Sequence, residues 1–89
     1  MILALVLATV AALIAAVLLG KKNVRFETRC RAKIKDQKVK KGSLVERPDQ
    51  PKRAGRTFAG WYYDEDCTER WDFESDTVEE NMTLYAKWI

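Results

Sequence analysis

The pattern of hydrophobic and polar positions changes abruptly after Gly20. Residues 1–19 read MILALVLATVAALIAAVLL, carry no charge, and include Thr9 as their one polar side chain. A helix needs about 20 apolar residues to cross a bilayer. The run therefore predicts one transmembrane α-helix over residues 1–20, followed by a basic linker at 21–23 and a folded domain at 24–89.

A cleaved secretory signal is the main alternative for this apolar segment. Such a signal starts with positive charge and ends at a cleavage site with small residues. No Lys or Arg precedes the run, and Leu18 occupies a position where cleavage before Lys21 would need a small residue. We therefore expect an uncleaved anchor, and a secreted single domain remains the alternative.

Small residues recur at every fourth position of the predicted helix. In membranes, helices associate where small side chains let two backbones approach each other. The pattern predicts a packing ridge and a helix–helix oligomer, with a coincidence among common alanines as the alternative. The ridge consists of Ala4, Ala8, Ala12, Ala16 and Gly20.

After Lys22 hydrophobic positions alternate with polar ones, which is typical of half-buried β-strands. The first predicted strand is VRFETRCR at residues 24–31. A second strand pattern contains Ile34 and Val39 and reaches a turn at Gly42, close enough to the first strand for a hairpin. The polar residues 46–56, which include both prolines, predict a loop.

Two further strands are predicted in the C-terminal half, TFAGWYYD at residues 57–64 and MTLYAKWI at residues 82–89. A glycine in mid-strand, here Gly60, indicates a bulge or a close approach to the backbone, which we expect from a ring. Simple alternation in the first of these strands predicts one face with Phe58, Gly60 and Tyr62 and another with Ala59, Trp61 and Tyr63.

The net charge of +3 hides a strong asymmetry. Residues 21–41 hold ten Lys and Arg against two acids, and residues 64–80 hold nine acids against Arg70 alone. Cations beside an apolar helix bind anionic lipid headgroups, and a solvated strand face is the plainer interpretation of the same pattern. The expected headgroup contacts are Lys21, Lys22 and Arg25. The expected protein contacts in the acidic part are Asp64, Glu65 and Asp66.

All nine Phe, Trp and Tyr residues lie after Gly20. A domain of this size has a marginal core unless large side chains fill it, and each ring can bury about 150–250 Å². We expect the rings to pack in the core, with a ligand-stacking platform as the alternative. The predicted core residues are Phe26, Phe58, Trp61, Trp71, Phe73, Leu84 and Trp88.

Residues 52–88, KRAGRTFAGWYYDEDCTERWDFESDTVEENMTLYAKW, resemble the internalin B-repeat, also called the Listeria–Bacteroides repeat. The resemblance rests on the Gly-Trp-Tyr, Trp-Asp-Phe and Met-Thr-Leu-Tyr-Ala-Lys-Trp motifs and extends back to Val24. It implies an α+β, mostly β fold: a small β-grasp-like (ubiquitin-like) sheet, here preceded by one transmembrane helix. The family's Asn-Gly-Gly turn is replaced by residues 29–31, so we expect the first hairpin to turn differently or nearer Lys35 and Asp36.

The residue types present do not indicate a catalytic, metal or cofactor site. There is no histidine, no glycine-rich phosphate loop and no recognisable calcium loop among the acids. We therefore expect no enzyme, no metal and no cofactor. Nucleic acid is not an expected partner, because the basic strand offers Phe26 as its one ring. Cys30 and Cys67 have no metal-ligand spacing, and a bridge between them stays open, although Cys67 fits better as a small core residue.

The resemblance implies a non-enzymatic surface module that acts as a spacer or contacts proteins. We predict a single-pass, membrane-anchored protein-interaction module whose partners are membrane lipid and other membrane or surface proteins. The alternative is a small structural accessory subunit of a membrane complex, held by its helix. We favour the extracytoplasmic side on the resemblance, whereas the positive-inside rule favours the cytoplasm.

Overall fold

The computed structural model describes residues 20–89. The predicted transmembrane helix therefore lies outside the described residues, apart from Gly20, and so do the ridge positions Ala4, Ala8, Ala12 and Ala16. Within residues 20–89, no helix has the length and apolar character that a membrane crossing requires.

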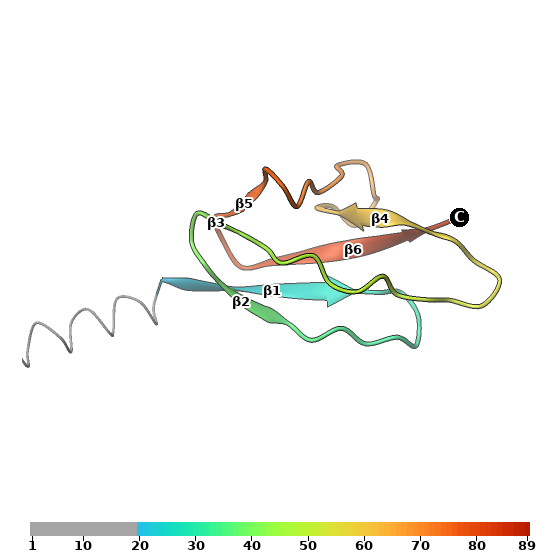
Figure 1. Cartoon of the computed structure of the whole chain (residues 1–89). Coiled ribbons are helices and arrows are strands. Elements are labelled where there is room, and N and C mark those ends of the chain that lie inside the picture. Colours follow the sequence, from blue (N-terminus) through green and yellow to red (C-terminus); the bar gives the residue numbers. More distant parts are fainter. Residues whose placement is uncertain (1–19) are drawn as a thin grey trace, which may run out of the picture.

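The described part of the chain is a small, mostly β domain without a helix, which confirms the mostly-β prediction at that level (Figure 1). One sheet has the strand order β2-β1-β6-β4, and β3 pairs with β5 in a second, two-stranded sheet. In the larger sheet β1 pairs antiparallel with β2 and parallel with β6, and β4 pairs antiparallel with β6. The strands are β1 (Lys21–Glu27), β2 (Gln37–Lys40), β3 (Ser43–Leu44), β4 (Phe58–Tyr62), β5 (Thr77–Val78) and β6 (Met82–Trp88).

Strand β1 begins at Lys21, so residues 21–23, which the sequence pattern indicated as a linker, lie within the strand. They pair with residues 38–40 of β2, and this pairing does not depend on hydrophobic alternation. The strand ends at Glu27, and the chain bends at Arg29, whose φ of 56° lies in the left-handed region. The expected β1–β2 hairpin is therefore present, and its turn starts at Arg29, before Lys35 and Asp36.

One face of the sheet forms the core. Phe26 of β1 is in register with Leu84 of β6, and the alternate residues of both strands point to the same side. The loop between β3 and β4 crosses this face in Figure 1. Of the seven predicted core residues, Phe58 and Trp88 are partly buried against the core, and the other five belong to its buried set. The buried set is Val24, Phe26, Val39, Val45, Trp61, Trp71, Phe73, Val78, Leu84 and Ala86.

A β-bulge in β4 overturns the simple alternation predicted for that strand. Phe58 pairs with Trp88, but Gly60 pairs with Lys87, so Ala59 is the extra residue. An extra residue shifts every following side chain to the other face. Phe58 therefore shares the core face with Trp61, and their ring centroids lie 5.4 Å apart in an edge-to-face contact.

Candidate functional site

The outer edge of β4 is paired over only part of its length. The Trp71 backbone N–H donates to the Trp61 carbonyl at 3.0 Å, and the Tyr63 N–H donates to the Glu69 carbonyl at 2.8 Å. Around these bonds, Tyr62 and Arg70 form an isolated antiparallel bridge. β4 is the last strand of its sheet, so residues 58–60 form an open edge in the described part of the chain.

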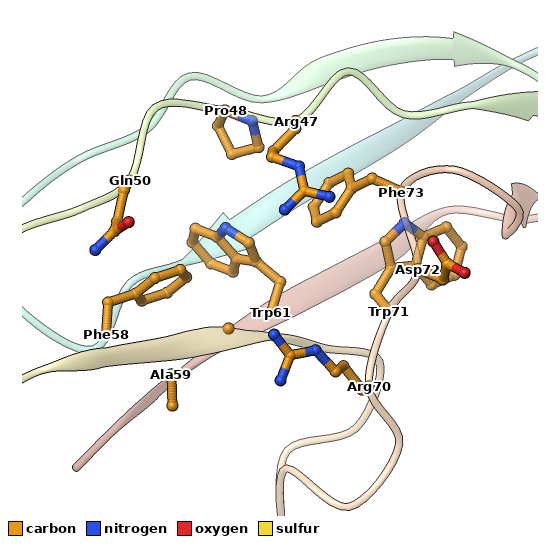
Figure 2. A pocket seen from close by; sticks show the side chains of 11 residues that line it. Arg47, Pro48, Gln50, Phe58, Ala59, Trp61, Arg70, Trp71, Asp72 and Phe73 are labelled. Carbon is orange, nitrogen blue, oxygen red and sulfur yellow. The ribbon is translucent and has the colours of Figure 1, made fainter.

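A groove of about 540 Å³ lies beside this open edge (Figure 2). Its lining combines aromatic side chains with two arginines, Arg47 from the loop after β3 and Arg70 from the segment that bridges to β4. In Figure 2 the two guanidinium groups lie on opposite sides of Trp61. The aromatic residues of the lining are Phe58, Trp61, Trp71 and Phe73.

The two arginines occupy different faces of the sheet. Gly60 is in register with Lys87 on the face away from the core, and a Cβ at Gly60 would lie 2.9 Å from the Arg70 guanidinium. Arg70 therefore covers Gly60 on the outer face, with its Cζ 5.9 Å from the centre of the Tyr62 ring. Arg47 stands on the core side, where its Cζ lies 5.0 Å from the centre of the Phe73 ring. The close approach expected at Gly60 thus comes from a guanidinium and not from a ring.

Asp72 is the acidic residue in the groove lining, and the turn after Trp71 occupies its carboxylate. Its two oxygens accept hydrogen bonds from the Glu74 backbone N–H at 2.9 Å and the Ser75 hydroxyl at 2.8 Å. The Glu74 bond is the main cause that lowers the pKa of Asp72, with the Ser75 bond next and Arg47 a smaller contribution. Asp72 therefore closes a turn and stays ionised, and the groove lining carries two arginines against this one carboxylate.

The wall of the groove contains a buried polar atom with no partner. Trp71 is 8% exposed, and its indole Nε1 has no hydrogen-bond acceptor within residues 20–89. Most buried polar groups in proteins are paired, so an unpaired donor at a groove is notable. By contrast, Trp88 Nε1 donates to the Thr28 carbonyl at 2.7 Å.

The acidic turn predicted as a protein contact has a structural role at Asp64. The Asp64 carboxylate accepts bonds from the Thr68 and Glu69 backbone N–H groups at 2.8–3.0 Å and from the Thr68 hydroxyl. These bonds, the hydroxyl first, lower the pKa of Asp64. Glu65 and Asp66 are exposed at the tip of the same turn.

The outer face of the sheet carries two of the three residues predicted to contact headgroups. Lys21 and Arg25 are exposed there, and Lys21 stands directly opposite Lys40 of β2. Lys22 has the opposite orientation, because it pairs with the core residue Val39, and it is half-buried. The Arg25 guanidinium lies 3.6 Å from the Glu27 carboxylate.

Both cysteines are half-buried free thiols, so the bridge left open at the sequence level is absent. Cys67 has a φ of 55°, and the Arg29 guanidinium donates to its Sγ at 3.5 Å. Within residues 20–89, no cluster of His, Cys, Asp and Glu side chains could hold a metal ion.

Comparison with known sequences identifies the family. The sequence model of the Listeria-Bacteroides repeat domain matches residues 23–87, which include most of β1 and β6 and all of β4. The chain belongs to this family. The match includes residues of all four strands of the larger sheet and every residue that lines the groove.

Curated relatives contain this repeat domain within much longer chains. A protein of Evansella cellulosilytica named "Putative membrane protein" is 48% identical over 66 residues, which are 74% of this chain and 10% of the relative. A "Putative Gly-rich membrane protein" of the same organism is 44% identical over 66 residues, 74% of this chain and 8% of its own. Internalin H of Listeria monocytogenes is 40% identical over 57 residues, 63% of this chain and 10% of its own. The chain thus spans about a tenth of the length of the curated relatives it matches.

Sequence reasoning did not single out the two arginines of the repeat domain's groove. Arg47 stands in a loop, and nothing in its surroundings distinguishes it from other exposed cations. Arg70 had a usable signal, because it is the one cation among the acids of residues 64–80. Gly60 was the second signal, since a strand glycine indicates that something approaches the backbone there.

Proposed function

We propose that this chain is a non-enzymatic, membrane-anchored protein-interaction module that presents one repeat domain at the bilayer surface. Two relatives carry the word membrane in their names, and the apolar residues 1–19 immediately precede the turn that leads into β1. The proposal assigns lipid contact to the N-terminal end of the sheet and protein contact to the remainder of the domain. It includes no cofactor.

The observation that carries the proposal is a concentration of like charge at the end of the sheet nearest residue 20. Lys21 is in register with Lys40, and the neighbouring pair of Asn23 and Lys38 adds a third cation to the same outer face. Like charges directly opposite each other destabilise a sheet. Anionic headgroups would offset that repulsion and attract each cation by roughly 1 kcal/mol near the surface.

The strand arrangement supports the finer, β-grasp-like fold implied by the family resemblance. A parallel pair, β1 and β6, stands at the centre, and an antiparallel hairpin partner, β2, stands outside β1. In this domain a loop takes the position where a helix would be expected to cover the core face.

The lipid part of the proposal is tested with the full chain reconstituted into vesicles. We compare vesicles of phosphatidylcholine alone with vesicles that also contain phosphatidylglycerol, and we measure acylation of Lys38 and Lys40 by a water-soluble amine reagent. Anionic lipid is expected to protect both lysines. The matched control is the acylation of Lys33 and Lys35, which are exposed in the β1–β2 connection. Equal protection of all four lysines, or of none, contradicts the assignment.

The protein part is tested by native electrophoresis of mildly solubilised membranes, comparing the parent chain with a variant in which the exposed Glu65 and Asp66 are both replaced by lysine. Loss of an associated protein, with the thermal unfolding midpoint unchanged, supports the interaction module. Migration at high mass with fixed stoichiometry, unaffected by any change to the domain, supports the accessory-subunit alternative instead. Labelling of Cys30 and Cys67 by an impermeant thiol reagent in intact cells tests our preference for the extracytoplasmic side.

A further inference from the structure

We infer that the groove beside β4 binds an extended peptide as an added strand, and that the peptide alternates acidic and apolar side chains. This inference deepens the proposed function, on which it rests, by naming the docking site and the chemistry of the protein partner. Backbone hydrogen bonds at a sheet edge supply affinity in such complexes, and pockets for alternate side chains supply specificity.

The backbone of β4 provides the first argument. The segment ending at Trp71 runs antiparallel beside β4 and bonds to Trp61, and then it turns away at Asp72. Within residues 20–89, no segment therefore pairs with the outer edge of β4 at residues 58–60. A peptide strand that follows the same line would extend the sheet and enter the 540 Å³ groove.

The side chains of the groove provide the second argument, because they differ between the two faces of the edge. On the core face, a peptide side chain would meet the rings of Phe58 and Trp61, which are 5.4 Å apart. On the outer face, it would meet the Arg70 guanidinium above Gly60. Successive residues of a strand point to opposite faces. An apolar residue on the rings therefore places its neighbours toward the arginine, where a carboxylate fits.

Charge complementarity selects the acidic class of peptide. Arg47 and Arg70 approach the groove from opposite sides, and the carboxylate in the groove lining, Asp72, accepts hydrogen bonds within the turn that it closes (Figure 2). Arg70 is exposed, and within residues 20–89 it has no carboxylate within salt-bridge distance. Guanidinium groups pair with carboxylates through short, charge-assisted hydrogen bonds.

The test uses the full chain in zwitterionic detergent micelles and a blocked synthetic peptide of about eight residues that alternates glutamate and valine, a usual strand length. Binding is followed by backbone amide shifts of residues 58–60 and by tryptophan fluorescence. We expect saturable binding, and Arg70→Gln is expected to raise the Kd about tenfold, whereas Arg47→Gln, on the core face that receives the valines, is expected to raise the Kd by less. Arg31→Gln, a matched change at an exposed site in the β1–β2 connection, is expected to leave the Kd unchanged.

Backbone methylation separates strand addition from simple charge attraction. One version of the peptide is N-methylated at the glutamates, and a second version is N-methylated at the valines. Because backbone N–H groups alternate between the two edges of a strand, only one of these two versions loses the N–H groups that face β4. One pattern is expected to abolish binding while the other is tolerated. A peptide alternating lysine and valine is expected not to bind. Arg70→Lys, which keeps the charge, retains binding and serves as the folded reference if Arg70→Gln unfolds.

Three results would overturn the inference: no saturable binding of the glutamate peptide, equal binding of the two methylated peptides, or a Kd unaffected by Arg70→Gln. Binding of a second copy of this chain in place of the peptide would also overturn it. These failures are separable from failure of the proposed function. If the protein association survives in native membranes while the peptide does not bind, the module remains and the partner contacts another surface.

Discussion

Gly60→Ala tests the interpretation of the bulge and of Arg70 in a single experiment. Gly60 has a φ of 139°, a conformation that costs other residues about 1–3 kcal/mol. The added Cβ would also lie 2.9 Å from Nη2 and 3.0 Å from Cζ of Arg70. Because the guanidinium ends an exposed, flexible side chain, it can move aside, which loses its contact with the Tyr62 ring at about 0.5–1 kcal/mol. The two contributions together predict a loss of about 1.5–4 kcal/mol in the free energy of unfolding.

The assay is urea unfolding followed by tryptophan fluorescence, with a thermal scan in parallel. In a domain of this size each kcal/mol lowers the midpoint by about 4–8 °C. The control is Gly55→Ala, where φ is 74° but nothing lies within 4 Å of the added Cβ, so a loss of about 1 kcal/mol is expected. In an Arg70→Ala background, Gly60→Ala should still cost about 1–3 kcal/mol, because the backbone strain remains. If removing Arg70 restores the whole loss, or if Gly60→Ala costs no more than Gly55→Ala, the backbone explanation is wrong.

Two further predictions concern tryptophan donors and capping carboxylates. Trp88→Phe should lower the free energy of unfolding, measured in urea, by about 1–3 kcal/mol because the Thr28 carbonyl loses its donor. Trp71→Phe should stay within about 1 kcal/mol of the parent, since it removes an unpaired buried donor. The reverse order of the two losses would contradict the hydrogen-bond assignment. Asp64→Ala should destabilise at pH 7 more than Asp66→Ala, whose side chain is exposed at the turn. The pKa of Asp64 is lowered from 3.8, so its contribution is present above that pH and fades as the pH falls through the folded value. The gap between the unfolding midpoints of the two variants should therefore narrow as the pH falls below 3.8, and a gap that does not narrow would refute the capping role.

The regular strands were the most predictable part of the fold. In β6, Leu84 and Ala86 alternate with half-exposed or exposed residues, and the strand ends within one residue of its predicted limit. In β1, Val24 and Phe26 show the same period. Alternation identifies such strands because one face is buried, and that face repeats every second residue.

Alternation could not predict the bulge or the pairing partners. Apart from Gly60, the hydrophobic pattern of β4 gives no sign of the extra residue. That residue is nevertheless the reason why Phe58 faces the core together with Trp61. The parallel pairing of β1 with β6 joins residues as distant as Phe26 and Leu84, and a local pattern holds no information on that register. The turn of the first hairpin was left open between residues 29–31 and the neighbourhood of Lys35 and Asp36, because a left-handed φ is expected at glycine and an arginine gives no signal of one.

The candidate site was less predictable than the core, since it is assembled from separate segments. Arg47 comes from the loop after β3, and Arg70 comes from the bridge to β4; each is ordinary where it stands in the sequence. Their approach to the same edge follows from the bulge and from the bridge, which are tertiary features. The acids drew attention because they are clustered, but the structure uses Asp64 and Asp72 to close turns.

The crowding of rings in residues 58–73 has one physical explanation that covers both the core and the groove. The loop that crosses the core face contributes few apolar groups, among them Val45 and the buried Pro51, so large rings must fill the space. At the open edge of β4 no neighbouring strand within residues 20–89 covers these rings, and Phe58 is therefore only partly buried. A ring variant at this edge would therefore weaken folding and binding together. The arginines touch the groove without filling the core, so it is their variants that can separate a binding role from a structural one.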